Sequence, residues 1–260
     1  MFSVTNSQIE VWLGLLLWPF FRILAMLAAD PFFSNRAVSI RTRGALALLL
    51  TVLIAPMLPP MPAVSPVSPL GILIIIQQVM IGAATGLVMR IMFTGIEMAG
   101  HVVGLQMGLG FASFFDPQHG ANTEVVAQFF SLMAMLIFLS LNGHLVVIET
   151  LAKSFVILPI SATPLKLAGL RLLVEAGSEI FMIGLVLSLP VLAALLITNL
   201  AMAIMSRAAP QFNLFAVGFA ITLSIGMAAL YYSLPRFVPQ VQMLIDHGAR
   251  LVERLAKSFL

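Results

Sequence analysis

Long apolar stretches separated by short polar ones dominate this sequence. The first runs from Ile9 to Ala29 and, at about 20 residues, is long enough to cross a hydrocarbon core of about 30 Å. The others run from Ala45 to Leu58, about Leu70 to Leu109, Thr123 to Leu158, Leu167 to Ala208 and Asn213 to Leu234. These runs are continuous and lack the alternation of a membrane-spanning strand, so they predict helices and not a β-barrel.

Three of these stretches are longer than one crossing requires. A continuous helix of 40 residues is about 60 Å long, roughly twice the bilayer core, so we expect these helices to tilt, break, protrude or fold back. The candidate breaks are glycines in the first stretch, Asn-Gly in the second and a proline in the third: Gly82, Gly86, Gly95 and Gly100; Asn142-Gly143; and Pro190.

The polar connections give an unclear topology. Six alternating spans would place residues 30–43, 104–124 and 207–213 on one side of a membrane, yet the positive charge around the first two spans indicates the opposite orientation from the rest. A proline-rich, uncharged connector, "APMLPPMPAVSPVSPLG", follows the second span and predicts an extended segment. We therefore expect that the helices do not simply cross a bilayer one after another.

The C-terminal stretch, residues 235–260, differs in kind from the rest of the chain. Its apolar residues fall on one helical face, and its charged residues lie mostly off that face: Val241, Leu244, Ile245, Leu251, Val252, Leu255 and Phe259 against Gln242, Asp246, Arg250, Glu253 and Lys257. This pattern predicts an amphipathic helix for a bilayer surface or a partner protein.

Composition supports a membrane protein. Hydrophobic residues make up 61% of the chain and charged residues only 9%, with a mean hydropathy of +1.10, whereas a soluble domain carries about 25% charged residues. The predicted fold class is therefore an all-α, membrane-embedded protein forming one helical domain over residues 1–260. Its start, "MFSVTNSQIEVW", lacks the basic region of a cleavable signal peptide.

The same composition excludes several kinds of chemistry. Cysteine is absent, so no disulfide, thiolate metal site or thiol nucleophile can form. The net charge of +3 is too small and too scattered to indicate nucleic-acid binding. No catalytic triad or phosphate-binding loop is present, and the glycines lie along helices where they permit close packing. We predict no enzyme, no cofactor and no metal.

Arg90, Glu97 and His101 share one face of the third predicted helix. Glu97 and His101, four residues apart, could form half of a metal or proton-relay site, but no further ligand shows the required spacing. A buried contact between helices, or a contact with a neighbouring subunit, is the favoured interpretation. Glu175 and Glu179, four residues apart, indicate a helix end that is exposed to water.

The stretch "GLQMGLGFASFFDPQHGAN", residues 104–122, combines glycines with bulky aromatic side chains and ends in a turn signal. It is either a flexible connection between helices or a re-entrant loop that closes a pore. Irregular backbone at membrane depth is tolerated only inside protein or beside water, and apolar constrictions can close a pore by dewetting.

A second polar stretch, "SRAAPQFN" (residues 206–213), lies between two apolar helices. Pro210 predicts a helix end, while Arg207, Gln211 and Asn213 need water or a partner. Chemistry alone predicts a polar elbow there.

Four stretches in order resemble one known family: "FFRILAMLAADPFFS", "GLQMGLGFASFFDP", "NGHLVVIETLAKSFVILPI" and "SRAAPQFNLFAVGF". They are similar to the R subunits of type III export gates, the FliR/SctT family, over nearly the whole chain. "RAAPQFN" followed by "VGF" is the most specific part.

The resemblance implies a structural pore subunit of the flagellar export gate. Such a subunit assembles with P and Q subunits, with one R subunit per complex. Its fold resembles a P subunit and a Q subunit joined together. It also implies contacts with the flagellar B-type export component, the large export-gate protein, exported unfolded proteins and membrane lipid. The expected location is the bacterial inner membrane, within the flagellar basal body, raised towards the periplasm.

Carried over to this chain, the resemblance makes the 104–122 stretch an inward plug with Gly108, Gly110, Phe111, Phe114, Phe115, Asp116 and Pro117 as its candidate residues. Arg207, Pro210, Gln211 and Asn213 become an assembly or entrance elbow. Two alternatives stay open: the equivalent subunit of a virulence injectisome, and a small-molecule secondary transporter with Arg90, Glu97 and His101 lining its site. The sequence shows no convincing internal repeat of the kind that such transporters usually carry.

Overall fold

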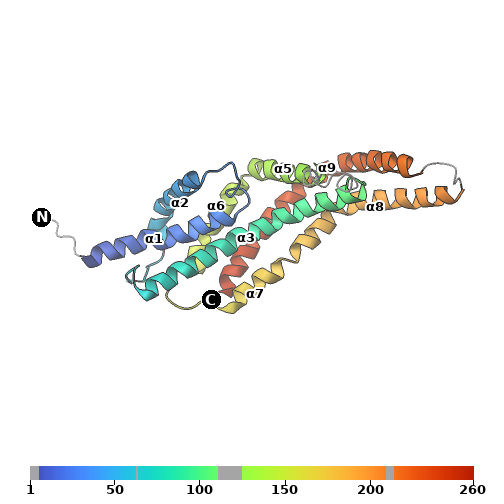
Figure 1. The fold of residues 1–260 in the computed structure, drawn as a ribbon. Helices are drawn as coiled ribbons and strands as arrows, with labels where there is room; N and C mark the ends of the chain where they lie inside the picture. Colours follow the sequence, from blue (N-terminus) through green and yellow to red (C-terminus); the bar gives the residue numbers. More distant parts are fainter. Residues whose placement is uncertain (1–5, 63, 111–124, 209–213) are drawn as a thin grey trace. The chain divides into compact units, whose positions relative to one another are not determined.

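The computed structural model describes residues 6–62, 64–110, 125–208 and 214–260, and all regular elements among these are helical (Figure 1). They are α1 (Asn6–Ala29), α2 (Ile40–Ile54), the 3₁₀ turn η1 (Ala55–Met57), α3 (Pro69–Gln106), α5 (Val125–Ser140), α6 (Gly143–Ile157), α7 (Leu167–Ala176), α8 (Glu179–Ala208) and α9 (Leu214–Ser258). Among the described residues, four helical stretches are long and apolar enough to cross a membrane, or five if the bent pair α5–α6 is one span. The prediction of an all-α membrane protein is confirmed.

Only one of the three predicted breaks occurs where it was expected. α5 and α6 meet at a bend of 71°, where Asn142 has a φ of 55°, a conformation that asparagine tolerates better than most residues. α3 is continuous through its four glycines. Pro190 lies inside α8, and the chain breaks instead at Gly177–Ser178, between α7 and α8.

α2 begins five residues before the predicted start of its apolar stretch. Ser39 caps it, because the Ser39 Oγ accepts a hydrogen bond of 3.1 Å from the Thr42 backbone N–H. The predicted start at Ala45 was wrong because the first turn of α2 carries Arg41 and Arg43, and hydropathy alone assigned both to the connection.

The amphipathic stretch 235–260 is the continuation of α9 and not a separate helix. α9 runs through Pro235 and Pro239 without a break. Its apolar face is buried by the chain itself: Val241, Ile245, Leu251, Val252, Leu255 and Phe259 are all at most 6% exposed. The prediction that this face serves a bilayer or a partner is therefore wrong.

The described chain forms two compact units. Unit 1 comprises Met1–Ile91, Asn142–Gly177 and Ile245–Leu260, and it contains α1, α2, α6, α7, the first part of α3 and the end of α9. In this unit α1 and α3 approach to backbone contact. A Cβ placed at Gly86 would lie 2.5 Å from Met26 O, and one at Gly82 would overlap Arg22 O. These two glycines thus permit close helix packing and do not break α3.

Unit 1 also fixes the end of α9. The Lys166 backbone N–H, just before α7, donates to Phe259 O at 3.1 Å, and the Phe259 ring fills the space over Gly169.

Unit 2 comprises Met92–Leu141 and Ser178–Leu244. Here the second part of α3 packs closely on three helices through glycines. Gly95 faces Ile183 of α8, Gly100 faces Ala127 of α5, and Gly226 of α9 faces Met107, just beyond the end of α3. Phe93 and Phe138 add an edge-to-face contact of 5.4 Å between ring centroids.

Candidate functional site

The 104–122 stretch starts from a well-defined helix end. α3 ends at Gln106, and Gly108 has a φ of 85°, which suits glycine because it lacks a Cβ. The Gly108 N–H donates to Leu105 O, and the Leu109 N–H donates to Gly104 O, both at 3.0 Å. This is the hydrogen-bond pattern of a Schellman cap, so Gly108 fixes the direction in which the chain leaves α3.

We call residues Met107–Gly110 the loop root. Met107 is fully buried, and a Cβ placed at Gly226 of α9 would lie 2.6 Å from Met107 Cγ. The Thr222 hydroxyl, one turn earlier on α9, donates to Met107 O at 3.3 Å. A side chain at position 226 would displace Met107, so the glycine there permits the contact. The loop root is therefore held on α9 by one side chain and one hydrogen bond.

The other end of the stretch lies beside the first. α5 begins at Val125, and the atoms facing Gly100 and Gly104 of α3 belong to Val126 and Ala127. The two glycines bring the start of α5 against the end of α3. The described residues on the two sides of 111–124 are thus neighbours in unit 2.

Of the predicted plug residues, Gly108 and Gly110 belong to the loop root. Phe111, Phe114, Phe115, Asp116 and Pro117 lie outside the described residues, so their part in a plug stays a prediction. Met107, Thr222 and Gly226 are contacts that sequence reasoning missed. The hydroxyl donor and its acceptor are 115 residues apart in the chain, and no local pattern marks such a pair.

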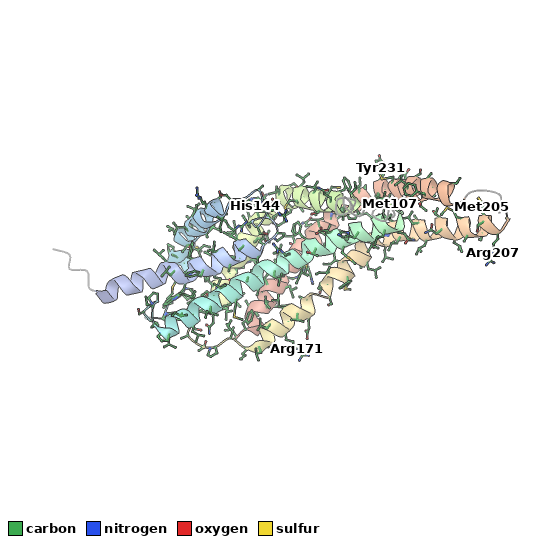
Figure 2. The ribbon with its side chains drawn as sticks, in the orientation of Figure 1. Met107, His144, Arg171, Met205, Arg207 and Tyr231 are labelled. Carbon is green, nitrogen blue, oxygen red and sulfur yellow. The ribbon has the colours of Figure 1, made fainter. Side chains whose placement is uncertain are left out.

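The predicted elbow lies between two helix ends. α8 ends at Ala208 and α9 begins at Leu214, so the "SRAAPQFN" stretch does separate the last two helices. Arg207 is exposed and points away from the end of α8 (Figure 2). Met202 of α8 packs on Gly218 of α9, which holds this pair of helices together beside the elbow. Pro210, Gln211 and Asn213 lie outside the described residues.

Arg90 belongs to unit 1, whereas Glu97 and His101 belong to unit 2. The Arg90 guanidinium donates to the Ser34 hydroxyl at 2.7 Å. Arg90 and Glu97 are exposed and His101 is half-buried, so the chain alone does not bury this set as predicted. A contact with a neighbouring subunit stays a prediction. Within the described ranges, no three His, Cys, Asp or Glu side chains come close enough together to hold a metal ion.

The strongest polar cluster was not predicted as a site. Arg22 lies inside α1 and is fully buried. Its Nε donates to Gln78 Oε1 of α3 at 2.7 Å, its Nη1 to Ser154 O at 3.2 Å and its Nη2 to Leu158 O at 3.0 Å. The guanidinium also lies over the Phe155 ring, 4.2 Å from the centroid. We call these residues the Arg22 clamp.

The Arg22 clamp binds carbonyls and not a carboxylate. Ser154 and Leu158 lie in and just after the last turn of α6, where the helix dipole is negative; Ser154 O also accepts the Leu158 backbone N–H at 2.9 Å. The buried cation thus joins α1, α3 and the end of α6 in unit 1. The sequence showed an arginine in an apolar run, but its partners are 56 to 136 residues away.

Asp30 follows α1 directly and is also buried. Its Oδ1 accepts the backbone N–H groups of Phe32 and Phe33 at 2.9 and 3.2 Å. Burial raises the pKa of the Asp30 carboxyl to about 6, although these two donors and the nearby Arg90 favour the charged form.

Comparison with known proteins decides the family. The family described as "Bacterial export proteins, family 1" matches residues 13–248. The chain belongs to this family. It is 44% identical over 246 residues to the flagellar biosynthetic protein FliR of Pectobacterium carotovorum subsp. carotovorum and 40% identical over 246 residues to that of Escherichia coli K12, covering 95% of this chain and 94% of each relative. The FliR of Aquifex aeolicus is 30% identical over 252 residues, covering 96% of each chain.

The resemblance to the FliR/SctT family is thereby confirmed. This bacterial export protein is a membrane-embedded component of the flagellar export apparatus, and the family is not an enzyme family.

Proposed function

We propose that this export protein is a structural pore subunit of the flagellar type III export gate. It assembles with P and Q subunits in the inner membrane, one R subunit per complex, in a core raised towards the periplasm. The B-type export component and the large export-gate protein join this assembly, and unfolded flagellar proteins pass through its pore. The similarity to proteins named FliR over nearly their full length supports this proposal.

Extensive exposed apolar surface also supports an assembled, membrane-embedded state. On α8 alone, Phe181, Met182, Leu185, Leu196, Ile197 and Leu200 are each more than half exposed. Such a surface is stable only against lipid or other subunits. The elbow between α8 and α9, with Arg207 exposed, is a suitable contact for a neighbouring P or Q subunit.

The 104–122 stretch serves as the gate in this proposal. Gly108 directs it away from α3, and its two ends are adjacent in unit 2, as a projecting loop requires. Phe111, Phe114 and Phe115 supply the bulk that closes the pore, with Asp116-Pro117 ending the run. One buried methionine and one hydrogen bond join the loop root to α9. In this proposal, opening of the gate releases Met107 from α9.

Assembly is tested by co-purification. The full-length chain should extract from membranes together with P and Q subunits, and its deletion should abolish motility. Arg207→Glu should reduce recovery of the partners while the chain itself still accumulates in membranes. A stable and active monomer that never associates with P and Q would overturn the proposal.

The gate is tested by permeability. Phe114→Ala/Phe115→Ala, or deletion of residues 110–115, should raise the leakage of ions and small solutes through assembled complexes because the obstruction is smaller. The matched control is Phe129→Ala/Phe181→Ala, which removes two exposed rings from α5 and α8 of unit 2. If permeability is unchanged in a correctly assembled loop variant, or rises equally in the control, the gate assignment fails while the assembly proposal stands.

A further inference from the structure

Unit 1 carries four arginines on or near the connection between α1 and α2: Arg36, Arg41, Arg43 and Arg90. Two of them bind the turn after α1. The Arg43 Nε donates to Phe33 O at 3.2 Å, and the Arg90 guanidinium donates to the Ser34 hydroxyl at 2.7 Å. Arg36 follows two residues later, and Arg41 lies in the first turn of α2. We call this group the arginine patch.

The arginine patch has unbalanced positive charge. None of its four members lies within ion-pair distance of an acidic side chain in the part of the chain that the structure describes. Asp30 is buried, its Oδ1 accepts two backbone N–H groups, and it is not within ion-pair distance of any of the four arginines, so at most one negative charge faces four positive ones. Arg36, Arg41 and Arg90 are exposed, and Arg43 is half-buried. A concentration of exposed guanidinium groups of this kind favours binding of an anion.

The surface next to the patch is apolar. α2 carries outward-facing residues along its length, and Leu49 and Leu53 are 57% and 62% exposed. The stretch Ile40–Met57 has the length and composition of a membrane span, and its arginines lie at its very start. Arginines at the end of such a span extend to the headgroup layer while their stems cover apolar surface.

The length of α3 independently indicates that the arginine patch lies at a membrane interface. From Pro69 to Arg90 the helix rises about 32 Å, which is close to the thickness of a hydrocarbon core. Arg90 therefore reaches one membrane interface when Pro69 lies at the other. The contact between Arg90 and Ser34 sets the start of α2 at that same interface.

We propose that the arginine patch binds the phosphate of an anionic phospholipid headgroup, with the acyl chains lying along the exposed face of α2. The apolar face of α2 favours a lipid over a free phosphate ion, which needs no such surface. It also favours a lipid over an acidic protein segment, because the charge lies at the end of a span.

The test uses the purified full-length protein in neutral detergent and a triple variant, Arg36→Gln/Arg41→Gln/Arg43→Gln. Bound lipid is counted by native mass spectrometry after addition of phosphatidylglycerol or phosphatidylcholine. Each arginine is expected to contribute a factor of about ten or less to the binding affinity. The triple variant should therefore bind phosphatidylglycerol on the order of a hundredfold more weakly than the native chain. Phosphatidylcholine binding should be equal in both proteins.

The matched control is Arg250→Gln/Arg254→Gln/Lys257→Gln, which removes the same charge from exposed positions of α9 in the same unit. It should bind phosphatidylglycerol like the native chain. Equal loss in the two variants would show a general charge effect and overturn the proposal.

Two measurements on the native chain remain informative even if the triple variant does not fold. Raising the salt from 50 to 500 mM should release phosphatidylglycerol, and inorganic phosphate or glycerol phosphate at the same concentration should not displace it. Displacement by the soluble phosphates would show a free-anion site. Loss of a co-purifying acidic protein from the triple variant, with lipid binding unchanged, would show a protein contact and overturn the lipid assignment.

Discussion

The two units bury polar groups in different ways. Unit 1 encloses a charged guanidinium, a carboxyl and two glutamine amides: Arg22, Asp30, Gln77 and Gln78. Among the described residues of unit 2, the buried polar side chains are the hydroxyls of Ser188, Thr198 and Thr222. Each of these hydroxyls bonds to a carbonyl of its own helix, and Thr222 also reaches the loop root. Buried polar groups that bond across several helices, as Arg22 does, favour one arrangement of those helices, whereas apolar and glycine contacts are easier to shift.

From this difference we infer different roles for the two units. Unit 1, held by the Arg22 clamp, gives a fixed support. Unit 2 carries the loop root, whose few contacts can be released without exposing a buried charge.

The largest expected effect comes from removing the clamp. Arg22→Met keeps the apolar volume but leaves Gln78 Oε1 and Leu158 O without the Arg22 donor in a buried site, whereas Ser154 O keeps the Leu158 N–H. An unpaired buried acceptor costs about 1–3 kcal/mol, so we expect a loss of about 3 kcal/mol in the free energy of unfolding. Thermal unfolding in detergent measures it, with Arg22→Lys as the charge-preserving control. A variant as stable as the native chain would show that the clamp contributes nothing.

The next effect concerns the glycine contacts, which both units use. Gly86→Ala in unit 1 and Gly100→Ala in unit 2 should each lower the free energy of unfolding by about 2 kcal/mol, because the added Cβ meets neighbouring backbone. Gly44→Ala on α2 is the control, since a Cβ there meets nothing within 4 Å, and it should be neutral or slightly stabilising. Equal behaviour of all three variants would show that close packing is not required.

A smaller effect is expected from Asp30 and depends on pH. Because burial raises the pKa of the folded Asp30 carboxyl from its ordinary 3.8 to about 6, the folded state holds this proton more tightly than the unfolded state. Its contribution is complete below pH 4 and is lost as the pH rises to 6. Asp30→Asn keeps an oxygen acceptor and cannot ionise, so it should be more stable than the native chain at pH 7 by on the order of 1–2 kcal/mol. The difference should disappear at pH 4. A constant difference across this range would contradict the raised pKa.

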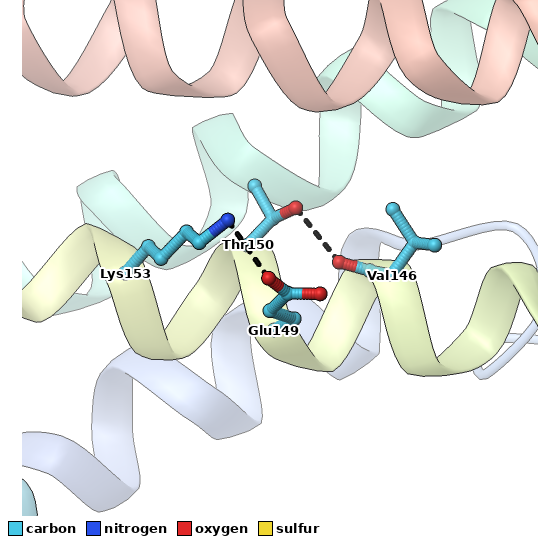
Figure 3. A network of polar contacts seen from close by, with 4 residues as sticks. All are labelled: Val146, Glu149, Thr150 and Lys153. Atoms are coloured by element: carbon cyan, nitrogen blue, oxygen red, sulfur yellow. Dashed lines mark hydrogen bonds and ion pairs between the residues drawn. The ribbon is translucent and has the colours of Figure 1, made fainter.

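The smallest effect is expected at an exposed ion pair. Glu149 and Lys153 lie one turn apart on α6, with their side chains joined at 2.8 Å (Figure 3). Because both side chains are largely exposed, Lys153→Gln should leave the unfolding midpoint unchanged within error. A clear fall in the unfolding midpoint would show that exposed charge stabilises unit 1 as buried charge does.

The sequence predicted the helices far better than their contacts. Long apolar runs and the resemblance to export-gate R subunits were enough for the fold class and the family, because hydropathy depends on the chain alone. The breaks were predicted less well, since Pro190 is accommodated within α8 while Gly177 and Ser178 end the preceding helix. Hydropathy does not distinguish a residue that a helix accommodates from a residue that ends the helix.

The partners of Arg22 and of Met107 could not be predicted at all. The hydrogen bonds that define them join residues 56 to 136 positions apart. They depend on how α3 packs against α1, α6 and α9, and a single sequence carries no record of that packing. Gly108 was noted as part of a glycine-rich run, but the predicted helix continued to about Leu109, so its role in ending α3 at Gln106 was not predicted.

A pair of engineered disulfides tests the central claim most directly, because the chain has no cysteine of its own. Met107→Cys/Gly226→Cys would lock the loop root to α9 in unit 2, and Phe259→Cys/Gly169→Cys would lock the end of α9 to α7 in unit 1. The Cγ atoms of Met107 and Phe259 each lie 2.6 Å from a Cβ placed at the facing glycine, so the two locks are geometrically matched. Oxidation should stop flagellar protein export in the first variant, reversibly on reduction, and leave export in the second equal to that of its reduced form. Continued export with the loop root fully cross-linked would contradict the account.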